Sequence, residues 1–158
     1  MNLKQFSKQI ATTGGATYNI VTGDVPTSGY AASTKGHEKV VEIPSEWDSY
    51  TSGERETFIS MHVLDFIAIN GLKLETEWDY MGAWTDDGKI YFDVTRVFDE
   101  MYDAVLFGIL NEQRAIYDFN RGESIELPQG QTHGTMTQIM NYAKMTATAL
   151  THKILTNA

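Results

Sequence analysis

The chain contains no cysteine and only three prolines in 158 residues. Without cysteine it can form no disulfide, no thiolate metal site and no thiol nucleophile, which fits a reducing compartment. The longest strongly apolar stretch, Val63 to Ile69, is interrupted by Asp65 and is far shorter than a bilayer-spanning helix. Met1 to Ile10 lacks an apolar segment followed by a small-residue cleavage site, so we expect a cytoplasmic protein.

Positive charge is also scarce, because 12 Lys and Arg residues face 21 Asp and Glu residues, for a formal net charge of −9. Between Glu38 and Leu127 there are 20 acidic and 7 basic residues, a net of −13, whereas the two ends together carry +4. A concentrated negative field repels nucleic acid and anionic membranes and speeds association with a basic protein surface. We therefore expect a partner protein with a basic surface, no direct nucleic-acid contact and no membrane contact.

Motifs of known catalytic chemistry are missing. The sequence has no G-x-S-x-G elbow, no phosphate-binding loop, no dinucleotide fingerprint and no H-E-x-x-H motif. Its four histidines, His37, His62, His133 and His152, do not stand at metal-ligand spacing from one another. We expect no catalytic residue, no cofactor and no metal.

Apolar residues at helical spacing predict a short helix over residues 3–10, ended by Gly14 and Gly15. A T-x-x-E capping box at residues 51–54 begins a second helix, which Gly71 is expected to end in the left-handed conformation. A third helix is predicted over residues 98–110.

Strand-like segments cover residues 16–21, 38–43, 80–85, 89–95, 114–119 and 123–127. The step from Asp87 to Gly88 between two alternating runs is a strong hairpin signal. In the second of these runs Ile90, Phe92 and Val94 share one face, and the other face carries Tyr91 and Asp93. We expect Asp86, Asp87 and Asp93 to be exposed to solvent.

The C-terminal segment begins with PQGQTHG at residues 128–134, and its content of helix breakers predicts a linker. Thr135 and Gln138 then form a capping box, followed by an apolar stripe at spacings of three and four: Met136, Met140, Ala143, Ala147, Leu150 and Ile154. Such a stripe must be buried, either against its own domain or against a second copy. Because the linker is long enough to release the helix, we expect a dimer through this stripe.

These elements predict an α+β fold, with an antiparallel sheet, two helices packed on one face and a C-terminal helix after a short linker. We expect one domain over residues 1–127, the linker over 128–134 and the C-terminal helix over 135–158.

Five segments together suggest a family: GGATYN at 14–19, TSGYAAS at 27–33, GHEK at 36–39, GAWTDDGKIYFDV at 82–94 and QRAIYDF at 113–119. Over about residues 14–127 the chain resembles small uncharacterised accessory proteins of tailed bacteriophages, especially phages of actinobacteria. The resemblance implies action in the host cytoplasm by protein–protein interaction. No activity is known for these proteins, so the resemblance carries over no functional residue.

Nine carboxylates between Glu75 and Asp103 face only Lys89 and Arg96. Such a stretch either imitates the phosphates of DNA and occupies a basic cleft on a host defence enzyme, or is simply a solvated acidic face. Exposed aromatic rings near carboxylates can anchor a protein interface, although they also serve in cores. Our candidate interaction residues are Glu75, Glu77, Asp79, Asp86, Asp87, Asp93, Trp47 and Trp78.

Two other functions stay open. A nucleotide could be held between aromatic rings if cations met its phosphates, and the candidates are Lys35, Lys39, Arg55 and Arg114. Alternatively, paired carboxylates could hold a divalent metal for hydrolysis, although the sequence selects no pair.

Overall fold

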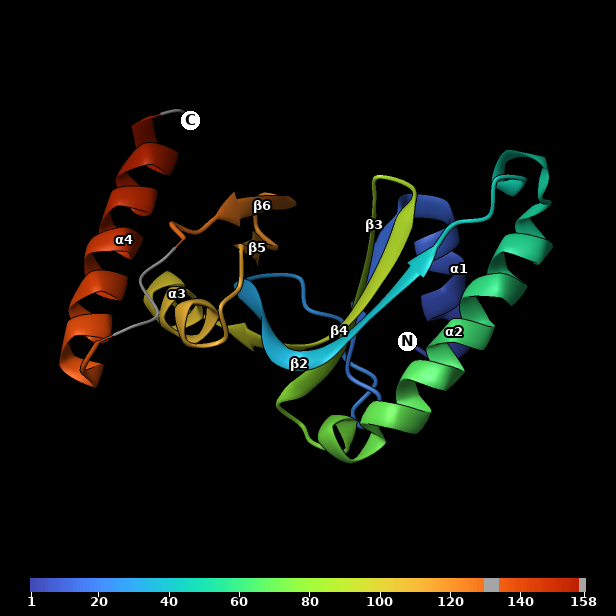
Figure 1. The fold of residues 1–158 in the computed structure, drawn as a ribbon, viewed down its shortest axis with the longest axis horizontal. Helices are drawn as coiled ribbons and strands as arrows, with labels where there is room; N and C mark the ends of the chain where they lie inside the picture. The colour runs from blue at the N-terminus through green and yellow to red at the C-terminus, as the bar shows by residue number, and fades with distance from the viewer. Residues whose placement is uncertain (130–133, 157–158) are drawn as a thin grey trace. The chain divides into compact units, whose positions relative to one another are not determined.

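A computed structural model describes residues 1–129 and 134–156 of the chain (Figure 1). In chain order the elements are α1 (Leu3–Thr13), β1 (Gly15–Tyr18), β2 (Tyr30–Glu42), η1 (Trp47–Ser49), α2 (Ser52–Leu74), β3 (Asp79–Asp86), β4 (Lys89–Phe98), α3 (Met101–Leu110), β5 (Ala115–Asp118), β6 (Glu123–Glu126) and α4 (Met136–Thr156). The strands form one antiparallel sheet in the order β1-β3-β4-β2-β5-β6. This confirms the predicted α+β class with a C-terminal helix.

The chain divides into two compact units, which we describe separately. Unit 1 comprises Met1–Pro26 and Gly36–Thr95, and unit 2 comprises Thr27–Lys35 and Arg96–Ala158. The domain boundary at residue 127 stays a prediction. Residues 130–133 of the predicted linker and residues 157–158 of the predicted C-terminal helix lie outside the described residues.

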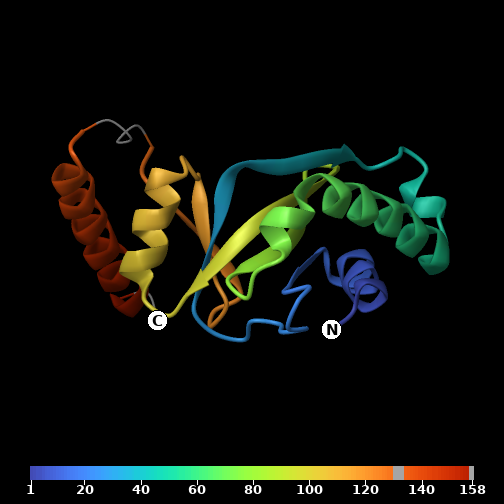
Figure 2. The same cartoon turned by 90° about the horizontal axis from the view of Figure 1, so that it is seen from below.

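The first helix of unit 1, α1, forms where its apolar spacing predicts it. Asn2 caps its first turn reciprocally with Gln5, and Gly14 ends it with φ +81°, a conformation that favours glycine. Phe6 and Ile10 are buried in the core of unit 1. Both views show α1 beside α2 (Figures 1 and 2).

The second helix of unit 1, α2, begins at the predicted capping box between Thr51 and Glu54. Its predicted end at Gly71 is wrong, because the helix continues to Leu74 and Gly71 has no positive φ. Burial of the Leu74 side chain outweighs the weak helix preference of glycine. Among the described helices, only α2 is long and apolar enough to cross a membrane. A single such helix is weak evidence for a membrane span, because core helices have the same length and composition.

The hairpin of β3 and β4 has the predicted two-residue loop. Asp87 (φ 43°) and Gly88 (φ 72°) both take positive φ, as a type I′ turn requires. Ile90, Phe92 and Val94 are fully buried and share the face that packs in the core with α1 and α2, as predicted.

Three strand boundaries differ from their predictions by three residues or more, and one of them is the end of β4 at Phe98 instead of Thr95. β1 ends at Tyr18 instead of Val21, because the Asn19 side chain accepts hydrogen bonds from the amides of Val21 and Thr22 and turns the chain. β2 begins at Tyr30 instead of Glu38, and its first residues pair with β5, a segment distant in the sequence. Gly36 lies within this long strand and has a φ of +81°.

Unit 2 contains α3, the β5–β6 hairpin and α4. The predicted third helix starts at Met101 instead of Phe98, because Phe98 still belongs to β4. The predicted hairpin is confirmed, and the buried Asp118 side chain accepts from the amides of Asn120 and Arg121 in its turn.

The C-terminal helix α4 lies beside α3 in both views (Figures 1 and 2). Of the predicted stripe, Ala143 and Ala147 are buried, and Leu150 and Ile154 pack against the same core. The other two members, Met136 and Met140, are exposed. Most of the stripe is thus covered by its own chain, and the dimer stays a prediction.

Candidate functional site

The sheet of unit 1 has one face that neither α1 nor α2 covers. Core residues of β3 and β4 point toward the two helices, so the alternate residues point the other way. On β3 and β4 these alternate residues are Tyr80, Gly82, Trp84, Asp86, Lys89, Tyr91, Asp93 and Thr95. We call this surface the aromatic face.

Trp84 and Tyr91 form the centre of the aromatic face. Their rings stack with centroids 4.2 Å apart and an angle of 11° between the planes. Trp84 is 46% exposed although it stands in the middle of a sheet. Its neighbour on β1 is Gly15, which has no side chain to cover the indole on that side. The pair is therefore a preformed aromatic surface available to a partner.

Beside the aromatic pair, Gly82 leaves room for the Asp93 carboxylate. A Cβ atom at Gly82 would collide with Asp93 Oδ1 and come within 3.1 Å of Thr95 Oγ1. The Thr95 hydroxyl donates a short hydrogen bond to Asp93 Oδ1. Asp93 is only 8% exposed, so the expectation that it faces solvent is wrong. It is a structural residue of the sheet.

Carboxylates lie on two sides of the aromatic pair, at the hairpin tip and on β2. Asp86 and Asp87 lie at the exposed tip of the hairpin, and Glu38 and Glu42 are exposed on β2. We call these four residues the acidic rim. Among the β3 and β4 residues of this face Lys89 is the only cation, and its Nζ lies 3.5 Å from Glu42 Oε1. The aromatic face therefore carries a strongly negative field.

Asp79, another predicted interaction residue, is buried with 1% exposure. It accepts a hydrogen bond from Thr76 Oγ1 at 2.9 Å, and Lys73 Nζ lies 3.6 Å from it. These contacts join the end of α2 to the start of β3. Asp79 thus holds unit 1 together and presents no charge to a partner.

The remaining predicted residues do not form one patch. Glu75, Glu77 and Trp78 are exposed just before β3, and Trp78 is 72% exposed. Asp86 is the last residue of this eight-residue strand and Asp87 follows it, roughly 25 Å away at the usual rise of a strand.

Trp47 is half-buried and has a structural role. Its ring contacts Phe58 edge-on at 5.7 Å, and the Arg55 guanidinium lies 5.3 Å from its centroid. Arg55 Nε also donates to the Trp47 carbonyl at 3.1 Å. Trp47 therefore braces the first turns of α2.

Three of the four cations considered for a nucleotide site are already engaged by other residues, and the fourth, Arg114, belongs to unit 2. Lys35 Nζ lies 2.5 Å from Glu112 Oε2, and Lys39 Nζ lies 3.2 Å from Asp65 Oδ2. Arg55 is held against Trp47, and Arg114 is exposed in unit 2. Within residues 1–129 and 134–156, no group of three or more His, Cys, Asp or Glu side chains is placed to hold a metal ion.

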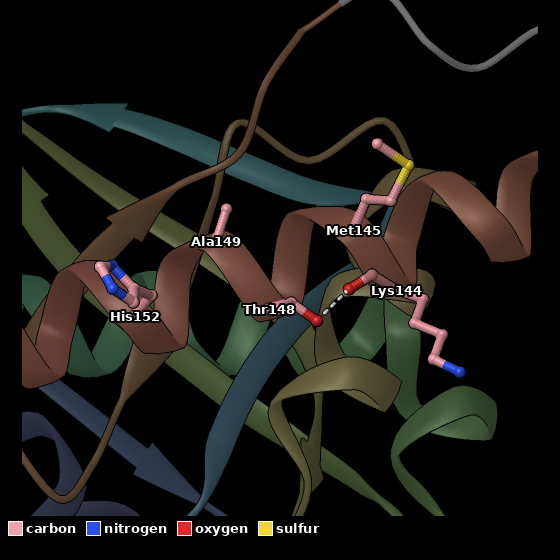
Figure 3. Close-up of a pocket in the computed structure, with 5 residues that line it drawn as sticks. All are labelled: Lys144, Met145, Thr148, Ala149 and His152. Carbon is pink, nitrogen blue, oxygen red and sulfur yellow. Dashed lines mark hydrogen bonds between the residues drawn. The ribbon is translucent and has the colours of Figure 1, made fainter.

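A shallow depression runs along the outer side of α4. It is lined by Lys144, Met145, Thr148, Ala149 and His152 (Figure 3). Thr148 Oγ1 donates to the Lys144 carbonyl one turn earlier, at 2.9 Å, so its hydroxyl is already used by the helix. All five residues come from one helix, which gives this surface little enclosure.

Four residues of the site were not among the predicted interaction residues: Trp84, Tyr91, Glu38 and Glu42. A sequence signal existed for the aromatic pair, because a two-residue loop at 87–88 places residues 84 and 91 directly opposite each other. No comparable signal existed for β2, because which of its faces is covered depends on α2.

The comparisons with known proteins give no relative. No known protein family, no curated protein and no solved structure matches this chain.

Proposed function

We propose that this chain is a non-catalytic protein-interaction module that binds a basic partner on its aromatic face. The observation that carries the proposal is a stacked pair of the exposed Trp84 and the half-buried Tyr91 beside an acidic rim. Aromatic faces attract Arg and Lys side chains by about 0.5–2 kcal/mol each, and carboxylates can pair with the same cations. The arrangement suits a cationic protein segment better than an anionic ligand.

A nucleotide is less well suited to this surface. The rings could stack a base, but the phosphates would meet Glu38, Glu42, Asp86 and Asp87. Lys89, the cation closest to the rings in the sheet, is already beside Glu42. Metal-dependent hydrolysis receives no support from the described residues either.

The finer proposal keeps the phage resemblance. We propose that the partner is a host protein with a basic surface, met in the host cytoplasm, and that the chain inhibits a nucleic-acid-handling defence enzyme. Exact imitation of DNA by the whole acidic stretch is weakened, because Asp79 and Asp93 are buried. The acidic rim keeps the charge that such a partner would meet.

The proposal can be tested with a synthetic arginine-rich peptide and its glutamate counterpart, titrated into the full chain by calorimetry. We expect only the cationic peptide to bind, with an affinity that falls as salt is raised. Trp84→Ala should weaken binding at least fivefold, because it removes the cation–π surface. Trp78→Ala removes an equally large exposed ring outside the aromatic face and should leave affinity unchanged.

Equal loss in both tryptophan variants, or binding of the glutamate peptide, would contradict the proposal. A thermal-shift screen with nucleotides and divalent metals covers the alternatives, because a ligand of the native state raises the melting temperature. A clear shift with a nucleotide, abolished by Trp84→Ala, would favour nucleotide binding instead.

A further inference from the structure

β2 has an open edge beside the aromatic face. Its neighbours in the sheet are β4 on one side and β5 on the other, but β5 pairs only with Tyr30 and Ala31. On that side, Asn111 Oδ1 accepts from the Lys35 amide at 3.1 Å. In the part of the chain that the structure describes, residues 36–42 have no strand on this edge. An open edge of this length invites another chain to pair with it.

The direction of the free backbone groups follows from one hydrogen bond. Ile43 donates its amide to the Gly88 carbonyl at 2.8 Å, on the β4 side. Backbone groups of successive strand residues point to alternate sides, so Val41 and Lys39 also turn toward β4. Glu38, Val40 and Glu42 therefore direct their amides and carbonyls to the open edge.

The same three residues carry their side chains on the aromatic face. Lys39 reaches Asp65 and His37 contacts Asn70, both on α2, so the alternate residues of β2 lie on the opposite face. Val40 is 52% exposed and stands between the exposed Glu38 and Glu42. Along the open edge, the exposed side chains thus alternate acidic, apolar, acidic.

We propose that the partner binds by strand addition to this edge, with an extended segment of the pattern cation–x–apolar–x–cation. This inference rests on the proposed function and names the recognised element. The two cations would stand opposite Glu38 and Glu42, and the apolar residue would cover Val40. Cross-strand pairs of opposite charge stabilise the pairing of two strands, and the backbone ladder supplies further binding energy.

The residues marked x would point to the other face of the added strand, toward the flank of α2. Ile69 lies one helical turn after Asp65 on that flank and is 77% exposed. An apolar or aliphatic x residue can therefore cover Ile69. This gives the incoming segment one contact on each side of the sheet.

A second copy of this chain is a poor occupant of the same edge. Two copies of β2 paired antiparallel about Val40 would place Glu38 of one copy opposite Glu42 of the other. Like charges directly opposite each other destabilise a strand pair. The edge is thereby protected from pairing with itself while it stays open to a basic segment.

The test uses the full chain and an acetylated, amidated nonapeptide with the centre Lys-Thr-Val-Thr-Lys, followed by NMR. We expect binding with protection of the Glu38, Val40 and Glu42 amides from hydrogen exchange. A methyl group on the peptide nitrogen of the central Val should weaken binding at least tenfold, because we expect the added strand to be antiparallel and that N–H then faces β2 opposite Val40. A methyl group on the following Thr nitrogen, which faces away, should have little effect.

A charge-swap control uses the exposed pair Glu38→Lys and Glu42→Lys together with the peptide centre Glu-Thr-Val-Thr-Glu. The variant should lose the lysine peptide and gain the glutamate peptide, which a merely unfolded variant would not do. If the lysine peptide binds without amide protection, or both methylated peptides bind equally, strand addition is overturned and the proposed function stands. If the arginine-rich peptide binds through Trp84 but the nonapeptide does not, the inference alone fails. If neither binds, the proposed function fails with it.

Discussion

Replacement of Gly82 by alanine tests the account of the aromatic face at its tightest point. The new methyl group would collide with Asp93 Oδ1 and stand 3.3 Å from Asp93 Cγ. The neighbour that must move is a nearly buried carboxylate that accepts from Thr95, so the substitution should break this hydrogen bond. Hydrogen bonds to charged groups contribute roughly 1.5–3 kcal/mol.

The replacement of glycine by alanine also has a favourable effect, which makes the expected loss of stability smaller. Alanine in a strand interior is favoured over glycine by roughly 0.5–1 kcal/mol, because glycine loses more conformational entropy on folding. The net free energy of unfolding should therefore fall by about 0.5–2.5 kcal/mol. For a chain of this length that corresponds to a melting temperature lower by roughly 1–10 °C.

The assay is thermal and urea unfolding followed by circular dichroism, with Gly71→Ala as the matched control. Gly71 lies inside α2 with no atom within 4 Å of the added Cβ, so alanine there should stabilise by about 0.8–1 kcal/mol. In an Asp93→Ala background, Gly82→Ala should lose its cost, because the colliding carboxylate is gone. Our reasoning is refuted if Gly82→Ala melts at or above the wild-type temperature, or costs the same in both backgrounds.

Three further results are expected. Gly88→Val should lower the free energy of unfolding by about 1–2 kcal/mol, because a β-branched residue resists the positive φ of this turn. An unchanged free energy of unfolding would contradict the type I′ turn. Burial, followed by the charge of Lys39, lowers the pKa of His62 below 6.5, so the unfolded chain takes up this proton more readily. The contribution of neutral His62 to the free energy of unfolding should therefore be fully present above pH 6.5 and be lost as the pH drops below that value. In urea unfolding from pH 7.5 to 5.5, His62→Gln should make the free energy of unfolding depend less on pH. An equal pH dependence in both proteins would contradict the burial of His62. The predicted dimer should appear as twice the chain mass in light scattering and disappear on deletion of residues 129–158; a monomeric full chain at high micromolar concentration would show that α4 serves only its own unit.

The sequence was most informative where the chemistry is local. The capping box at Thr51 and the turn at Asp87 and Gly88 depend only on residues within a few positions, and both are confirmed. The alternation of Ile90, Phe92 and Val94 likewise predicts which face is buried. Each of these signals is fixed by the backbone geometry of one element.

Prediction failed where a distant segment decides. Tyr30 belongs to a strand because it pairs with Asp118, nearly ninety positions later. Gly71 stays helical because Leu74 is buried by other elements. Aspartate is a residue type usually found at the surface, so the burial of Asp93 was not expected. Its carboxylate has room only because Gly82 on the neighbouring strand has no side chain. The candidate site could not be predicted in full for the same reason, because its acidic rim combines residues of β2 with residues of the hairpin tip, which are distant in the sequence.

All three tryptophans, Trp47, Trp78 and Trp84, belong to unit 1, whereas unit 2 holds α3 and α4 and has none. Indole fluorescence therefore reports on one unit, while helical ellipticity reports on both. If the two units unfold as a single cooperative system, the two optical transitions will coincide. If unit 2 unfolds separately, the ellipticity will show a transition that is absent from the tryptophan fluorescence. The chain thus carries its own spectroscopic label for asking whether its two units share one folding transition.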